Sequence, residues 1–170
     1  MRITKAFWIW GQFNAEDTKF LNLIRNKVYS NLQGPRFDVH ITLAGPYLRL
    51  DKSIYDSMDN YAKTNKSINL KIKKYTFEKH FYKSIYISVE NSIRLQNIRN
   101  SLFRMKKFDS HSNFDPHISL IYGSFKESVK KNIIINLPKL KNNLLINKLS
   151  FVDVNENISQ WKIIENFELN

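Results

Sequence analysis

The order of strand-like and helix-like segments limits the folds open to this chain more than any other feature. Polar and apolar residues alternate, with many β-branched and aromatic side chains, in seven segments that we predict to be strands: Lys5–Phe13, Phe37–Pro46, Ile68–Phe77, Phe81–Glu90, Pro116–Tyr122, Leu144–Val154 and Gln160–Leu169. Helical periodicity predicts helices at Ala15–Leu32, at Asp51–Lys63, after Asn91 and from Ser124. This order, with strand pairs adjacent at 68–90 and 144–169, favours an α+β fold with largely antiparallel sheets.

The chain is expected to form one domain, residues 1–170, made of two similar lobes. It contains only four glycines and four prolines, and no linker or low-complexity tract divides it. Each half places a helix before a strand that carries a histidine motif, and the second half adds a helix and a hairpin. This arrangement predicts an internal duplication in which the two lobes face each other.

The composition excludes several classes of protein. The chain has no cysteine, so a disulfide scaffold, a thiolate metal centre and a cysteine nucleophile are all ruled out. The first apolar run, Ala6–Trp10, is too short for a signal peptide or a membrane span, and we expect a soluble, cytoplasmic protein. The net charge of +12 suits a polyanionic partner, but lysine, asparagine and isoleucine all have A/T-rich codons, so the charge alone identifies no partner.

Two histidine tetrapeptides carry the chemistry. The segment His40-Ile41-Thr42-Leu43 is echoed by His117-Ile118-Ser119-Leu120, and both fall in predicted strands. Residues two apart on a strand point to the same face, so each motif presents an imidazole and a hydroxyl about 7 Å apart. Two such pairs brought together across a pseudo-twofold axis would form a cleft with two imidazoles and two hydroxyls.

This set suits the cleavage of a phosphodiester without a metal. One imidazole removes a proton from the attacking oxygen while the other protonates the departing oxygen, and the hydroxyls bind the phosphate oxygens. Histidine serves both roles because its ordinary pKa of about 6.5 permits either protonation state near neutrality. The other two histidines, His80 and His111, lack the motif and are predicted in loops, although the turn at His80 could reach the cleft.

At this point the sequence resembles the 2H phosphoesterase superfamily, and most closely its cyclic phosphodiesterase branch. The repeated His-x-[Thr/Ser]-φ motif is the signature of that superfamily. Gly34-Pro35-Arg36-Phe37 is similar to the approach to the first motif, and Pro116 to Tyr122 to the second motif with its trailing tyrosine. Trp10 and Trp161 also stand where the branch carries tryptophans. Val39 departs from the proline that often precedes the first histidine.

The resemblance implies a bilobal α+β fold in which two antiparallel sheets line a central cleft and helices pack outside. It implies hydrolysis of a 2′,3′-cyclic phosphate of a nucleotide, an RNA end or ADP-ribose, with no metal or other cofactor. By position, His40 and His117 are the catalytic pair and Thr42 and Ser119 bind phosphate. By analogy His117 is the base and His40 the acid, although the sequence leaves the reverse assignment open.

Further residues are expected to bind the rest of the substrate. Strict strand alternation turns Tyr122 away from the cleft. A role for Tyr122 in the cleft therefore requires a bend after Leu120, which Gly123 permits. Basic and aromatic side chains interleaved on the strand at 68–77 suit nucleic acid, or else form a solvated outer face. The expected set comprises Tyr122, Trp10, Arg36, Tyr75, Phe77 and Tyr82.

Two alternatives remain open at this stage. A phage-type member of the superfamily would degrade cyclic oligonucleotide immune signals in the host cytoplasm with the same chemistry. A non-catalytic RNA-binding module would use the positive charge and the aromatic residues alone. The sequence implies no obligate protein partner, and we expect a monomer.

Overall fold

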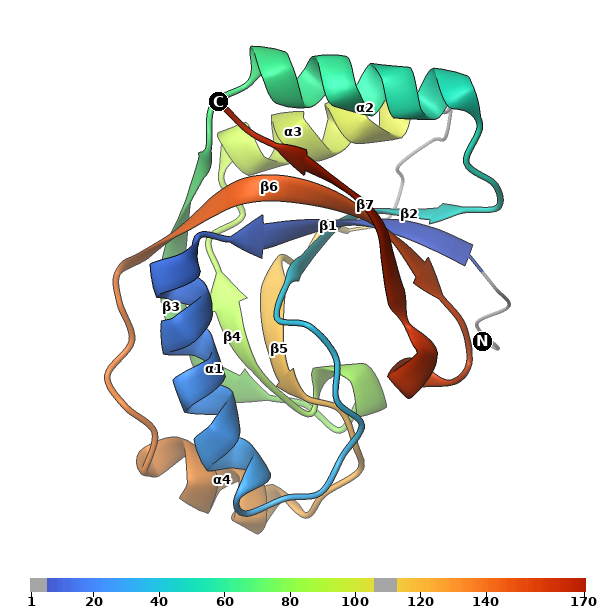
Figure 1. Ribbon diagram of the computed structural model, residues 1–170. Helices are drawn as coiled ribbons and strands as arrows, with labels where there is room; N and C mark the ends of the chain where they lie inside the picture. The colour runs from blue at the N-terminus through green and yellow to red at the C-terminus, as the bar shows by residue number, and fades with distance from the viewer. Residues whose placement is uncertain (1–5, 106–112) are drawn as a thin grey trace.

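The computed structural model describes residues 6–105 and 113–170 (Figure 1). His111 and the predicted strand start at Lys5 lie outside these ranges. The strands are β1 (Ala6–Phe13), β2 (Ile41–Tyr47), β3 (Ile68–Phe77), β4 (Ile85–Val89), β5 (His117–Ile121), β6 (Asn143–Val154) and β7 (Lys162–Glu168). The α-helices are α1 (Ala15–Tyr29), α2 (Lys52–Thr64), α3 (Ile93–Arg104) and α4 (Glu127–Ile135), and the short 3₁₀ turns are η1 (Phe81–Lys83) and η2 (Ile158–Gln160).

All strand pairs are antiparallel, and the strands form one seven-stranded sheet with the order β2-β1-β6-β3-β4-β5, with β7 also paired to β6. The strand β3 joins two portions of this sheet. Its residues 68–71 pair with β6, whereas residues 72–77 pair with β4. The predicted α+β class with antiparallel sheets is therefore confirmed.

Capping explains where most helices begin. The side chain of Asn14 accepts a hydrogen bond from the Asp17 N–H at the start of α1, and Asp51 caps α2 in the same way. The predicted helix start at Ser124 is wrong, because α4 begins only at Glu127 and Lys126 at its N-cap makes no side-chain capping bond. Gly123 has a φ of 149°, and a Cβ there would meet the Phe125 ring at 2.5 Å, so this turn holds the following residues outside the helix.

Two predicted strands begin four residues later than their patterns indicated. The strand expected at 37–46 begins only at Ile41, because residues 37–40 form an extended approach outside the ladder, so His40 lies directly before β2. The strand expected at 81–90 is divided into η1 and β4, since the backbone at Phe81–Lys83 turns before pairing resumes. Both irregular approaches lead to residues of the candidate site.

The helices cross over between the two halves. Helix α1 packs against β5 and helix α3 packs against β2, so each helix covers the motif strand of the other half. The main core lies between these layers, and its largest fully buried side chains include Tyr47, Phe151 and Leu21. Trp10, Val152 and Val154 form a separate apolar cluster, against which Trp8 and Trp161 pack.

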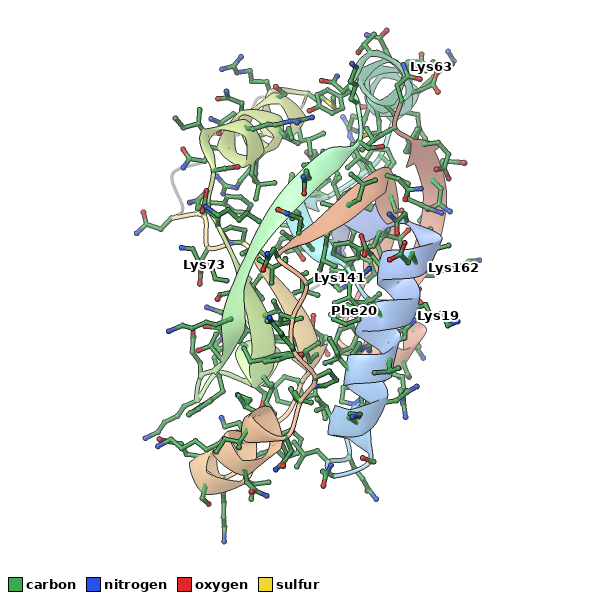
Figure 2. All side chains as sticks on the ribbon, turned by 90° about the vertical axis from the view of Figure 1, so that its left-hand side faces the viewer. Lys19, Phe20, Lys63, Lys73, Lys141 and Lys162 are labelled. Atoms are coloured by element: carbon green, nitrogen blue, oxygen red, sulfur yellow. The ribbon has the colours of Figure 1, made fainter. Side chains whose placement is uncertain are left out.

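The positive charge is spread over the surface. Figure 2 shows exposed lysines on separate elements, with Lys19 on α1, Lys63 on α2, Lys73 on β3 and Lys162 on β7. Within residues 6–105 and 113–170, no helix has the length and apolar character needed to cross a membrane.

Candidate active site

His40 is buried against an indole ring. Its imidazole is 5% exposed and stacks on Trp10, with ring centroids 3.5 Å apart and an interplanar angle of 5°. Phe37 meets the same imidazole edge to face at 5.9 Å. Because Trp10 lies opposite Thr42 in the pairing of β1 with β2, the sheet register places the indole beside the first motif.

His117 is the first residue of β5 and is only partly buried. Its ring meets Tyr86 edge to face at 5.3 Å, and Tyr86 lies opposite Ser119 in the pairing of β4 with β5. The register around the second motif thus matches that around the first, with a tyrosine in place of the tryptophan.

Both histidines are oriented by the same backbone contact. The Nδ1 atom of His40 lies 2.6 Å from the Asp38 carbonyl oxygen, and that of His117 lies 2.8 Å from the Asp115 carbonyl oxygen. A carbonyl oxygen can only accept a hydrogen bond, so each Nδ1 carries the proton in the neutral ring. Each Nε2 is then left free to exchange a proton with a bound molecule.

The sequence repeat is longer than the tetrapeptide. Phe37-Asp38-Val39-His40 corresponds to Phe114-Asp115-Pro116-His117, so the aspartates whose carbonyls orient the rings are part of the sequence repeat. These two aspartates were not predicted from the tetrapeptides, although comparison of the residues before each motif reveals the match. Arg25 lies 4.6 Å from the Phe37 ring centre, and Arg99 lies 4.8 Å from that of Phe114, which extends the equivalence to the helices.

The two motifs converge on one cavity of about 300 Å³. Its wall contains both motif histidines, and the two imidazoles are close enough for a charge on His117 to lower the pKa of His40. Aromatic side chains cover much of the remaining wall. The lining residues are Trp8, Trp10, His40, Thr42, His80, Tyr82, Lys83, His117, Tyr122, Val154 and Trp161.

A bulge brings Tyr122 into this cavity. Ile85 lies opposite Ile121 but Tyr86 lies opposite Ser119, so Leu120 is an extra residue in β5. The extra residue reverses the alternation after Leu120, and the Tyr122 ring stacks on Phe37 with centroids 4.0 Å apart. The bend that the sequence required is therefore present.

The two motif hydroxyls are placed differently. Thr42 lines the cavity beside His40. Ser119 is 5% exposed and does not line it; its hydroxyl donates to the Tyr82 carbonyl oxygen at 3.1 Å and also bonds to Tyr122. Strand alternation predicted equivalent positions for the two hydroxyls, but the Thr42 hydroxyl belongs to a residue that lines the cavity, whereas the Ser119 hydroxyl is bonded internally.

Three residues expected to bind substrate lie outside the cavity lining. The Arg36 guanidinium covers the Tyr29 ring at 3.9 Å, and the Tyr75 hydroxyl donates to the Pro138 carbonyl oxygen at 2.8 Å. Phe77 packs on the main core, with the Lys130 ammonium 5.2 Å from its ring centre. The basic and aromatic face of β3 therefore supports neighbouring segments, whereas Trp10, Tyr82 and Tyr122 line the cavity.

Trp8 and Lys83 also line the cavity, although neither was predicted as a site residue from the sequence. Trp8 lies two residues before Trp10, and strand periodicity places both on one face. A Cβ on Gly45 would meet the Trp8 ring at 2.6 Å, so this glycine lets the indole lie against the backbone. Lys83 belongs to η1, and no periodic signal marks it.

Charged groups of both signs cluster around His117. The Lys83 ammonium contacts Glu78 at 2.5 Å and Asp115 at 2.6 Å, and the Tyr86 hydroxyl donates to Glu78 at 2.6 Å. Burial lowers the pKa of Lys83, but its bonds to Asp115 and Glu78 raise it by more, so it remains charged. This cluster places two carboxylates and one ammonium around the second imidazole.

The two imidazoles consequently differ in proton affinity. Burial lowers the pKa of His40 to about 3, outweighing the bond to Asp38 that raises it, and the charge of Arg25 lowers it further. Burial also lowers the pKa of His117, as does Lys83, but the carboxylates of Asp115 and Glu78 oppose this change. His117 therefore holds a proton more readily than His40.

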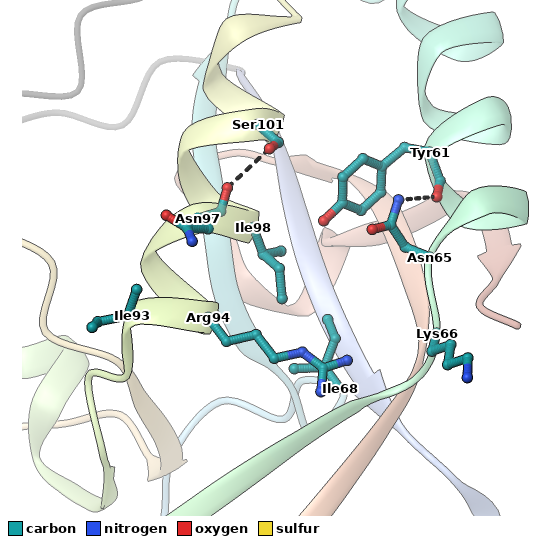
Figure 3. Close-up of a pocket in the computed structure, with 9 residues that line it drawn as sticks. All are labelled: Tyr61, Asn65, Lys66, Ile68, Ile93, Arg94, Asn97, Ile98 and Ser101. Atoms are coloured by element: carbon teal, nitrogen blue, oxygen red, sulfur yellow. Dashed lines mark hydrogen bonds between the residues drawn. The ribbon is translucent and has the colours of Figure 1, made fainter.

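A second cavity, of about 370 Å³, lies between α2 and α3 (Figure 3). Tyr61, Arg94 and Asn97 line it, together with the apolar side chains of Ile68 and Ile98, and it contains neither motif histidine. Among the residues that the structure describes, no three histidine, cysteine, aspartate or glutamate side chains gather closely enough to hold a metal ion.

The fold has counterparts among solved structures, although no family model and no curated protein matches the sequence. The chain has the fold of the 2H phosphoesterases. E. coli LigT, solved in complex with 3′-AMP, is similar over 98% of both chains with a TM-score of 0.64 and 12% identity. The protein TT0787 of Thermus thermophilus is similar over 96% of this chain and 97% of its own, with a TM-score of 0.62 and 14% identity.

Proposed function

We propose that the protein is a phosphodiesterase that opens a 2′,3′-cyclic phosphate by acid and base catalysis with His40 and His117. The observation that carries this proposal is the pair of imidazoles on one cavity, each with Nδ1 held by the carbonyl of an aspartate two residues earlier. Both Nε2 atoms are thereby available to the same bound phosphate.

The local charges favour His40 as the base and His117 as the acid, the reverse of the assignment made by analogy. His40 is buried and its low pKa keeps it neutral, so its Nε2 accepts a proton from water. The water oxygen bonds to phosphorus while the bond from phosphorus to one ribose oxygen breaks. His117, beside Asp115 and Glu78, donates a proton to that oxygen, leaving a terminal phosphate monoester. The proton taken by His40 is later released to solvent, and His117 takes one up, so the cycle closes.

Thr42 is the hydroxyl that we assign to the phosphate, because it lines the cavity beside His40. Its O–H would donate to a non-bridging oxygen and stabilise the charge that builds there. Ser119 takes the equivalent role only if its hydroxyl turns away from the Tyr82 carbonyl oxygen. We therefore expect Thr42 to contribute more to catalysis than Ser119.

The aromatic wall supports a nucleotide substrate. Trp8, Trp161 and Tyr82 line the cavity beside the two imidazoles and are only partly buried, and a nucleobase stacks favourably on accessible aromatic rings. LigT has been solved in complex with 3′-AMP, with ATP and with NADP+, which is consistent with this class of ligand.

The test is a substrate panel in the presence of EDTA, comparing 2′,3′-cyclic mononucleotides, ADP-ribose cyclic phosphate and cyclic di- and trinucleotides. We expect the 2′,3′-cyclic compounds to be opened to monoesters with the chelator present. Turnover of the cyclic oligonucleotides alone would instead support degradation of immune signals. Salt-dependent RNA binding without any product would support the non-catalytic module and overturn the proposal.

A further inference from the structure

A hollow lined by three lysines lies next to the histidine cavity. It has a volume of about 320 Å³ and is lined by Lys79, Gly123, Ser124, Phe125, Lys126 and Lys130. We call it the lysine hollow. The function proposed above assigns no role to it.

The lysine hollow holds an excess of positive charge. In the part of the chain that the structure describes, Lys79 and Lys126 form no ion pair, and both are exposed. The nearby Glu127 is paired with Lys131 at 2.6 Å. Lys130 is 2% exposed, and its ammonium donates to the Glu78 carbonyl oxygen at 2.6 Å. Burial lowers the pKa of Lys130, and the charge of Lys79 adds to this effect while Glu127 opposes it. A bound anion would relieve the repulsion between these ammonium groups.

Two chain segments form the boundary between the lysine hollow and the histidine cavity. Lys79 lines the hollow and His80 lines the cavity; Gly123 lines the hollow and Tyr122 lines the cavity. Consecutive Cα atoms are only about 3.8 Å apart, so the two spaces are neighbours. Glu78 links them further, because its carbonyl is held by Lys130 while its carboxylate bonds to Lys83 beside His117.

An exposed aromatic ring lies at the same boundary. Phe81 is 40% exposed, its ring meets Tyr82 of the cavity at 5.1 Å, and its carbonyl oxygen accepts the Gly123 N–H at 3.0 Å. Solvated aromatic rings beside lysines are the combination that binds single-stranded nucleic acid, because bases stack on the ring while phosphates pair with the ammonium groups.

We propose that the lysine hollow binds a phosphodiester of an oligonucleotide whose cyclic phosphate end occupies the histidine cavity. The inference rests on the proposed function and narrows the substrate to the end of an RNA chain rather than a free mononucleotide. The terminal nucleoside lies against the aromatic wall, the preceding base stacks on Phe81, and the phosphodiester on its 5′ side contacts Lys79 and Lys126.

The test compares a trinucleotide that ends in a 2′,3′-cyclic phosphate with the matching cyclic mononucleotide. We expect wild-type kcat/KM to be higher for the trinucleotide, and the ratio of the two values to fall about tenfold in Lys79→Ala/Lys126→Ala. The matched control is Lys19→Ala/Lys27→Ala on α1, which removes the same charge from exposed side chains that line neither the lysine hollow nor the histidine cavity, and should leave the ratio unchanged. A ratio that is equal in all three proteins overturns the inference.

A binding measurement separates this inference from the proposed function. Titration with a trinucleotide carrying a 3′-phosphate, and with 3′-AMP, gives a ratio of Kd values that requires no turnover. We expect the lysine variant to lose the preference for the trinucleotide and to reduce the slope of log Kd against log salt by about 0.7 to 1. If this result appears while neither cyclic compound is opened, the hydrolytic function fails but the binding site stands. If the affinity ratio and slope match those of the control variant, the site is refuted.

Discussion

The segments around His40 and His117 share a backbone plan but not a chemical environment. In each, an aspartate carbonyl holds Nδ1, an aromatic residue of the neighbouring strand lies opposite the motif hydroxyl, and a bulge follows. Yet His40 stacks on the Trp10 indole and is almost fully buried, whereas His117 borders an ion-paired lysine and two carboxylates. The shared backbone contacts orient the two imidazole rings, and the different neighbouring side chains set their proton affinities.

The largest predicted effect tests what the two segments share, which is an imidazole that takes part in catalysis. His40→Ala and His117→Ala should each lower kcat by about 10²- to 10⁴-fold, because each removes one of two proton transfers. Steady-state kinetics on a 2′,3′-cyclic nucleotide measures the loss, and thermal unfolding checks that each variant is folded. A variant that kept near wild-type turnover would show that its imidazole takes no part in the reaction.

The next effect concerns burial of the first imidazole. Because the pKa of His40 is about 3 in the folded protein and 6.5 as a free group, the unfolded chain binds a proton that the folded chain excludes. The contribution of His40 to the free energy of unfolding is therefore lost as pH falls from about 6.5 toward 3. The loss amounts to about 3 kcal/mol between pH 7 and pH 4. Urea unfolding of wild type and His40→Phe at these two pH values measures this loss of unfolding free energy.

The phenylalanine variant retains a ring to stack on Trp10, so the comparison isolates the proton. We expect His40→Phe to lose less stability on acidification than wild type, because it lacks the imidazole that binds a proton only in the unfolded chain. The contributions of the other titrating groups cancel when the two proteins are compared. His117→Phe should change this acid sensitivity less, since the second imidazole is only partly buried. Equal acid sensitivity of wild type and His40→Phe would contradict the burial argument.

The smallest effect concerns the charges around the second imidazole. Asp115→Asn removes a carboxylate that raises the pKa of His117, so that pKa should fall. The acid must be protonated, and the alkaline limb of the kcat/KM profile should move to lower pH by the same amount. The matched variant Asp38→Asn keeps its backbone carbonyl and, among the described residues, breaks no ion pair. If both variants shift the alkaline limb of the kcat/KM profile equally, the unequal charges around the two histidines do not cause the difference between their pKa values.

Much of the fold was predictable from periodicity, because alternating and helical patterns report which face of an element is buried. The positions of His40, Thr42 and His117 on the cavity followed from the motif and the strand period. The internal bond of the Ser119 hydroxyl did not, since Tyr82 comes from η1, where the pattern predicted a strand. For the same reason Lys83 was missed, as its position depends on how η1 folds against the second motif.

Other features were present in the sequence but needed a second comparison. Aligning the residues before the motifs reveals the aspartates at 38 and 115, whereas their carbonyl contacts appear only in three dimensions. Tyr75 and Phe77 carried a nucleic-acid pattern, yet packing against the Pro138 segment and the core, respectively, removed them from the cavity. Alternation identifies a face but does not identify what covers it.

A crystal structure of the protein with 3′-AMP would test most directly whether both imidazoles act on one phosphorus. We expect the phosphate group in the histidine cavity, with the Nε2 atoms of His40 and His117 each about 2.7–3.2 Å from its oxygens and both Nδ1 contacts retained. A phosphate bound away from the cavity, or contacted by only one of the two rings, would contradict the account.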